Sequence, residues 1–174
     1  MNNRVLEFPC VPVKQPLGEF YIGSIPSKDL IEITKVDIRR IEGEKGFETY
    51  LGIQRPKNER RVKEIAKYTK TEDACFPTAV ILAVSGNCVT FNSEKNVLIL
   101  SEYIDEENPD ESIKFNEIAN VLDGQHRIEG LKEANIQNDF EINLSIFIDI
   151  DIADQGIHPA NYVLDLKFCG YSFL

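Results

Sequence analysis

A glycine turn at residues 123–124 joins a short apolar run to an amphipathic run. Residues 119–122 (ANVL) predict a strand, and the Asp-Gly pair favours a tight turn because glycine accepts backbone angles that a β-carbon forbids. After the turn, apolar side chains recur at helical spacing, at Ile128, Leu131 and Ala134. The order predicts a strand, a tight turn and a helix, and any fold of this chain has to accommodate that unit.

Two potential cations, His126 and Arg127, occupy the first turn of the predicted helix. That turn carries unpaired N–H groups and the positive end of the helix dipole, so cations there do not help the helix. They would serve a bound phosphate, which the same N–H groups attract, and Gly124 would let the phosphate approach the backbone closely. The alternative is an ordinary strand-to-helix turn with a solvated histidine and arginine.

The size and composition of the chain predict a single domain. With 174 residues, 43% of them hydrophobic, the chain can bury one core. We assign that domain to residues 1–152 and treat residues 153–174, where the apolar periodicity is lost, as a divergent or truncated tail. No run approaches the ~20 apolar residues of a membrane span, and the first residues lack the pattern of a signal peptide. We therefore expect a cytoplasmic protein without a membrane partner.

Charge is segregated along the chain. The net charge of −10 argues against broad adhesion to nucleic acid, which depends on neutralising phosphates with lysine and arginine. Residues 54–70 nevertheless hold seven cations and two acids, whereas residues 101–112 hold six acids and no cation. Within the first of these segments, apolar residues at helical spacing predict a helix from an N-cap at Asn58 to about Lys70. The sequence thus predicts a basic helix, whose charges an ordinary solvated surface would also explain, and an acidic loop.

The N-terminal part of the chain reads as extended segments around one short helical turn. Residues up to about Lys14 contain two prolines and predict an extended piece at the edge of a sheet. Residues 20–25 and 33–41 predict strands, and Ser27 between them is placed to cap a short helical turn.

The remaining strands are predicted from continuous and alternating apolar runs. Residues 78–84 are continuously apolar, which is typical of a strand covered on both faces, and residues 88–92 and 97–100 follow them as a predicted meander. Residues 140–151 alternate strongly and predict a strand beside 119–122.

Two aspartates, Asp149 and Asp151, share the polar face of that last strand. They could hold Mg²⁺ next to a phosphate, or they could be the ordinary polar positions of a half-exposed strand. Four widely spaced cysteines show no metal-ligand spacing and predict free thiols.

The run Asp123-Gly124-Gln125-His126-Arg127 resembles the signature of the DGQHR-domain family, whose best-known branch is DndB, a regulator of DNA phosphorothioate modification. Gln54-Arg55, the segment 61–68 and Pro77-Thr78 are similar to the preceding part of the same family pattern. The resemblance covers roughly residues 36–152 and ends at the tail.

The DGQHR family is in turn similar to the ParB and sulfiredoxin superfamily, in which a loop at a helix start binds nucleotide phosphates. The resemblance implies an α/β (α+β) fold, a mixed sheet with flanking helices. It implies that Gly124 allows close approach, that His126 and Arg127 are phosphate ligands, and that Arg55 and Arg61 point toward the same site. Sulfiredoxins carry a catalytic cysteine before the His-Arg pair, and Gln125 stands there in this chain, so sulfinic acid reduction is not supported.

Three functions remain open at this stage. The first is a DndB-like module that binds a nucleotide or nucleic-acid phosphate and acts as a DNA-associated regulator linked to DNA modification or phage defence. The second is an enzyme, a nucleoside triphosphatase or nuclease, in which Asp123 or Gln125 positions water and a nucleoside triphosphate binds with Mg²⁺. The third is an interaction protein with a vestigial site. The sequence leaves the oligomeric state open, and we expect Arg127→Ala to lose anion affinity while keeping the fold.

Overall fold

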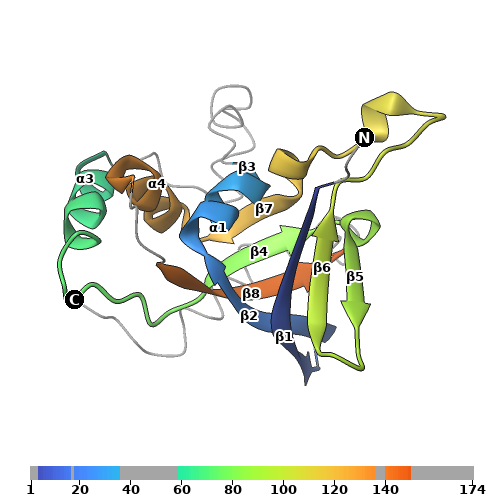
Figure 1. Cartoon of the computed structure of the whole chain (residues 1–174), viewed down its shortest axis with the longest axis horizontal. Helices are drawn as coiled ribbons and strands as arrows, with labels where there is room; N and C mark the ends of the chain where they lie inside the picture. Colours follow the sequence, from blue (N-terminus) through green and yellow to red (C-terminus); the bar gives the residue numbers. More distant parts are fainter. Residues whose placement is uncertain (1–3, 17, 36–58, 136–139, 150–174) are drawn as a thin grey trace.

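The computed structural model describes residues 4–16, 18–35, 59–135 and 140–149. Their architecture is a mixed eight-stranded sheet with the order β3-β7-β4-β8-β2-β1-β6-β5, accompanied in the described residues by three α-helices (Figure 1). The predicted α/β fold with a mixed sheet and flanking helices is confirmed. The strands are β1 (Val5–Gln15), β2 (Gly18–Pro26), β3 (Thr34–Lys35), β4 (Val80–Val84), β5 (Val89–Asn92), β6 (Val97–Ser101), β7 (Ala119–Asp123) and β8 (Glu141–Ile148), and the helices are α1 (Ser27–Ile33), α3 (Glu59–Tyr68) and α4 (Gln125–Ala134).

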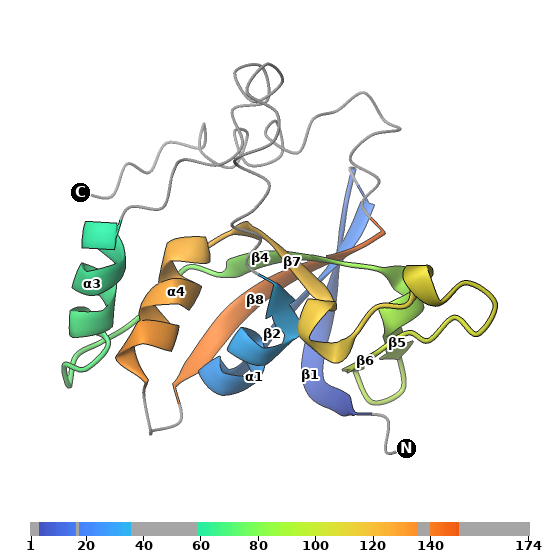
Figure 2. The ribbon, with the colours of Figure 1, turned by 90° about the horizontal axis from the view of Figure 1, so that it is seen from above.

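The hydrophobic core lies between the sheet and the helices. Alternate residues of the central strands β4 and β8 are buried, as period-two side-chain alternation requires when one face of a strand is covered. The strand predicted at 78–84 is therefore fully covered on one face and only half-covered on the other, not covered on both. Apolar residues of α1 and α4 belong to the same buried cluster, and Figure 2 shows α1, α4 and α3 on one side of the sheet. None of the helices in the described ranges is long and apolar enough to cross a membrane.

Two predicted strand neighbours are wrong. β4 pairs with β7 on one side and with β8 on the other, so it forms no meander with β5 and β6, which pair with each other as a hairpin. β8 does not lie beside β7 either, because β4 separates the two strands. Both errors assume that strands close in the sequence are close in the sheet, whereas β4 and β8 form a parallel pair from segments far apart in the chain.

The predicted edge segment at the N-terminus is instead an interior strand. The first half of β1 pairs with β6, from Val5 to Pro9, and the second half pairs with β2, from Cys10 to Gln15. β1 therefore links two parts of the sheet that run in different directions (Figure 1). Pro9 and Pro12 fit here because each half exchanges its ladder bonds with a different neighbour, so a missing N–H can face the other side.

Helix α1 is present where a short helical turn was predicted, but Ser27 is not its cap. Pro26 occupies the N-cap position, no side chain caps the helix, and Ser27 is the first helical residue. Of the strand predicted at 33–41, Ile33 is instead the last residue of α1, and Thr34 and Lys35 form β3, which pairs in parallel with β7. Asn58, Arg55, Asp151 and the tail at 153–174 lie outside the described residues, so the domain boundary at 152 stays a prediction.

Helix α3 packs closely on α4 through a glycine. The buried residues Val62 and Ala66 lie on the predicted apolar face of α3, and Ile65 meets α4 at Gly130. A β-carbon at Gly130 would lie 2.4 Å from Ile65 Cγ2 and 3.3 Å from the Val62 carbonyl oxygen. Glycine inside a helix costs about 1 kcal/mol of stability relative to alanine. At Gly130 the missing side chain lets the two helices approach closely.

We expect Gly130→Val to destabilise the protein by about 1–3 kcal/mol, because the added methyl groups overpack the contact with Ile65. Urea unfolding of the wild type, Gly130→Val, Ile65→Ala and the double variant measures the effect and its coupling. In the double variant the space vacated by Ile65 should restore part of the loss. Strictly additive effects of the two substitutions would contradict direct contact.

Candidate functional site

The predicted strand, tight turn and helix are present at the junction of β7 and α4. β7 ends at Asp123, Gly124 is the N-cap residue, and α4 begins at Gln125. The Gly124 carbonyl oxygen accepts the first helical hydrogen bonds, from the N–H groups of Arg127 at 2.9 Å and Ile128 at 3.1 Å. No side chain caps the start of the helix.

Gly124 is required by its backbone and by its neighbours. Its φ of +97° lies in the left-handed region, which residues with a β-carbon rarely adopt. A β-carbon there would also lie 2.9 Å from Val80 Cγ2 and 3.1 Å from Arg127 Nη2. The sharp turn predicted for this glycine is confirmed, whereas close approach of a ligand to it stays a prediction.

The guanidinium of Arg127 binds the backbone at the entrance to β4. Nη1 donates to the carbonyl oxygen of Thr78 and, at 3.0 Å, to its hydroxyl. Nη2 donates to the Ala79 carbonyl oxygen at 3.0 Å and lies 3.5 Å from Asp123 Oδ2. The side chain is only 15% exposed, and this burial lowers the pKa of Arg127 from its ordinary value. Both terminal nitrogens of Arg127 thus face protein acceptors, so the residue anchors α4 to β4 whatever else it binds.

Arg61 of α3 lies within electrostatic reach of the same junction. Its charge lowers the pKa of both His126 and Arg127. For His126, burial is the larger cause of the lowered pKa, and the nearby carboxylates of Asp123 and Glu129 oppose the shift. The structure therefore brings together five of the predicted site residues and Arg61: Asp123, Gly124, Gln125, His126, Arg127 and Arg61, all of them at least partly accessible.

Asp149 lies away from this junction. Its carboxylate oxygen Oδ1 accepts a hydrogen bond from the Gly86 N–H at 2.6 Å, and its own N–H donates to the Val84 carbonyl oxygen at 3.1 Å. It therefore fixes the turn at the far end of β4, while Gly124 touches Val80 at the near end. Asp149 does not join the phosphate ligands predicted from the sequence.

The described residues hold no group of three histidine, cysteine or acidic side chains arranged for a metal ion. Three of the four cysteines fall in the described ranges, and all three have free thiols, at Cys10, Cys75 and Cys88.

Sequence reasoning missed the residues that position Arg127 and α3. Ala79 acts through its backbone carbonyl, which every residue has, so no sequence signal identifies it. Thr78 accepts through its carbonyl and its hydroxyl and belongs to the Pro77-Thr78 part of the family pattern, but nothing in that pattern linked it to Arg127. Gly130 did carry a signal, because glycine is unfavourable inside a helix. A glycine within a helical pattern therefore indicates close packing at that position.

The fold and the junction define an α/β module with a cationic cluster where a strand passes into a helix. The DndB family, described as DNA-sulfur modification-associated, matches residues 8–156 of the chain. The chain therefore belongs to the DndB family. The match begins well before residue 36, where the resemblance noted in the sequence begins. No curated protein and no solved structure shows a significant match to the chain.

The contacts of Arg127 change the expectation for its removal. We expect Arg127→Ala to lower the free energy of unfolding by about 1–3 kcal/mol, because the carbonyls of Thr78 and Ala79 lose a charged donor. Arg127→Lys should recover little of this loss, since one ammonium group cannot reproduce a planar fork. Urea unfolding of both variants measures the change, with Arg60→Gln as the control. Wild-type stability of Arg127→Ala would show that the anchor is dispensable.

Proposed function

We propose that this protein is a phosphate-binding module of the DndB family, acting as a DNA-associated regulator of DNA sulfur modification. It binds a nucleotide or nucleic-acid phosphate at the β7–α4 junction. One observation carries the proposal: α3 packs on α4, and the charge of Arg61 on α3 acts on His126 at the start of α4, where no side chain caps the helix.

The backbone of the junction suits an anion. In any α-helix the first N–H groups lack intrahelical acceptors, and the helix dipole is positive at that end. Here the Gly124 carbonyl oxygen receives the N–H groups of Arg127 and Ile128, so the N–H groups of Gln125 and His126 precede the first helical bonds. A phosphate oxygen is a suitable acceptor for such groups.

The side chains of the junction add charge that an anion would stabilise. Arg61 is exposed and brings a permanent positive charge. The imidazole of His126 becomes cationic when it takes up a proton, and both of its ring nitrogens are then donors. Arg127 brings a third positive charge and holds the turn against β4. Asp123, with a side chain 47% exposed, is the opposing charge, and a phosphate beside Arg127 would compete with it.

Anion binding at the junction can be measured by calorimetry with pyrophosphate, CTP, ATP and GTP, each with and without Mg²⁺. We expect His126→Gln and Arg61→Gln each to weaken binding about tenfold, or about 1.4 kcal/mol, because each removes a donor or a charge. Asp123→Asn should strengthen binding, since it removes the competing carboxylate. Lys14→Gln is the control, because Lys14 is a cation of β1 paired with Glu19 and belongs to neither positively charged region.

Absence of binding by every one of these anions would defeat the proposal. Phosphate release in the same samples separates binding from hydrolysis. If Asp123 positions a water for hydrolysis, Asp123→Asn should abolish phosphate release while it strengthens binding.

The affinity should depend on pH through His126. Burial and Arg61 keep its pKa below the ordinary value of 6.5 in the free protein, with Asp123 and Glu129 opposing. A bound anion favours the charged imidazole and raises that pKa, so binding takes up a proton and strengthens as pH falls from about 8 to 6. Sulfate, whose own charge is constant over this range, is a suitable probe for calorimetry.

The His126→Gln variant should show a much flatter pH profile for sulfate than the wild type. The same shift has a consequence for stability without anion. Because the folded-state pKa is lowered, stability is present above about pH 6.5 and is lost as pH falls through the folded pKa. Equal pH profiles of sulfate affinity for the wild type and His126→Gln would exclude His126 as the titrating ligand.

A further inference from the structure

We propose that the outward face of α3 is a docking surface for the phosphate backbone of double-stranded DNA. We call this surface the basic face and define it by Arg60, Lys63 and Lys67 of α3 and by Lys70 just after the helix, with Arg61 at its edge. The inference rests on the DNA association in the proposed function, and it does not require the anion site at the β7–α4 junction.

The positive charges of the basic face do not contribute to holding α3 in the fold. Residues 59–70 contain five cations and two acids in a chain whose net charge is −10. The helix is held by its opposite face, where Val62, Ala66 and Thr69 are buried. Lys63 and Lys67 are four residues apart on α3, and like charges at this spacing on a helix repel. Such a pair is unfavourable by itself and is relieved by a polyanion.

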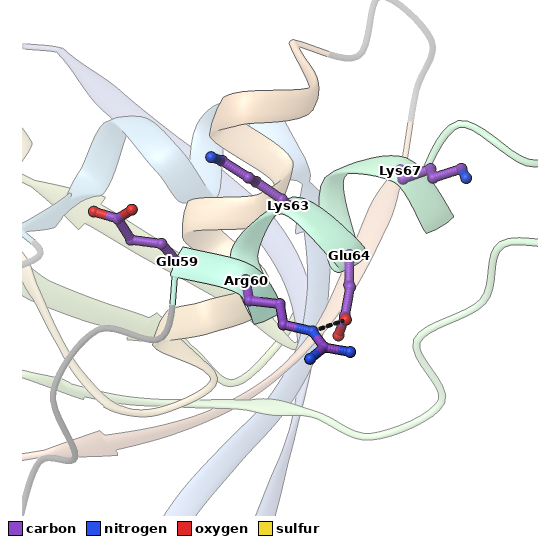
Figure 3. Close-up of a pocket in the computed structure, with 5 residues that line it drawn as sticks. All are labelled: Glu59, Arg60, Lys63, Glu64 and Lys67. Atoms are coloured by element: carbon purple, nitrogen blue, oxygen red, sulfur yellow. Dashed lines mark hydrogen bonds and ion pairs between the residues drawn. The ribbon is translucent and has the colours of Figure 1, made fainter.

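The dimensions of the basic face fit a DNA backbone. From Arg60 to Lys67 α3 advances about 10 Å at the rise of an α-helix, a length over which duplex DNA carries roughly six phosphate charges. The side chains border a hollow of about 500 Å³, lined among the described residues by Glu59, Arg60, Lys63, Glu64 and Lys67 (Figure 3). Glu64 accepts a hydrogen bond from Arg60 Nε at 2.8 Å, while Lys63 and Lys67 extend away from that pair (Figure 3).

The acidic segment sets the orientation of the molecule. It comprises residues 102–111 and lies at the end of the described structure opposite α3 (Figures 1 and 2). Two ends of opposite charge turn the molecule in the field of a polyanion, so that α3 faces the DNA and the acidic segment points away. The overall negative charge is therefore compatible with DNA binding through one face.

The basic face is fixed relative to the β7–α4 junction. The contact of Ile65 with Gly130 holds α3 against α4, and the charge of Arg61, at the edge of the basic face, acts on His126. DNA bound along α3 therefore lies next to the junction, and the two positively charged regions act on neighbouring phosphates.

A second copy of this chain is the competing occupant, because its acidic segment complements the basic face. Exposed ion pairs contribute about 0–1 kcal/mol each, and the described residues that define the basic face are all charged, whereas stable protein interfaces bury an apolar centre. DNA gains affinity from counterions released at each neutralised phosphate. DNA is therefore favoured over a second copy of the chain as the occupant of the basic face.

The test is the salt dependence of DNA affinity, measured by fluorescence anisotropy with a short duplex of mixed sequence between about 50 and 200 mM salt. We compare the full chain with the double variant Lys63→Gln/Lys67→Gln and with the control Lys14→Gln/Lys95→Gln. The control removes the same charge from exposed positions on β1 and the β5–β6 turn, far from α3.

We expect the α3 variant to bind at least tenfold more weakly at low salt, with the slope of log affinity against log salt reduced by about 2. The control should stay within about twofold of the wild type, and urea unfolding checks that both variants are folded. Equal losses in the two variants would show a net-charge effect and overturn the proposal. So would absence of DNA binding by the wild type at low salt, or a preference for RNA over the DNA duplex.

Sedimentation of the same proteins decides between DNA and a second copy. Self-association at low salt that Lys63→Gln/Lys67→Gln abolishes, without DNA binding, would assign the basic face to a protein contact. The anion site is tested separately, because His126→Gln should weaken pyrophosphate binding and leave the contribution of Lys63 and Lys67 to the salt slope unchanged. Failure of one proposal is therefore distinguishable from failure of the other.

Discussion

The bond between the Arg127 guanidinium and the backbone at Thr78 and Ala79 fixes the direction in which α4 leaves the sheet. Gly124, with its positive φ, permits a sharp turn but does not choose the direction of the next helix. The guanidinium does, because it reaches across the junction to the residues that lead into β4. A planar fork with several donors suits two neighbouring carbonyls, which a single ammonium group would satisfy poorly. The central strand and the helix that carries the candidate site are thereby held as one unit.

That unit also determines where the charges of the molecule lie. Gly130 lets α3 pack on α4, and the charge of Arg61 on α3 acts on His126. The positive charges of two helices, distant in the sequence, therefore converge at the start of α4. The acidic segment belongs to the connection between β6 and β7 and lies at the other end. The segregation of charge visible in the sequence becomes a polarity of the folded molecule.

What could be predicted from the sequence was local. The strand at 119–122, the turn at Gly124 and the helix after it follow from side-chain spacing and backbone preferences, and so does the buried face of α3. The partners of β4 and β8 and the interior position of β1 depend on pairings between distant segments. The same holds for Arg127, which the motif marked as a phosphate ligand, whereas its carbonyl partners lie 48 and 49 residues earlier.

The electrostatics of the junction give the strongest physical reason to expect a ligand there. Burial and the charge of Arg61 both disfavour the protonated form of His126, and the positive end of α4 adds to that cost. A structure selected only for stability would separate these groups or cap the helix with a side chain. Asp123 compensates in part, through its contact with Arg127 at 3.5 Å. A phosphate would compensate fully, because it accepts from the helix N–H groups and neutralises the side chains together, so its binding free energy would include the relief of repulsion already present in the free protein.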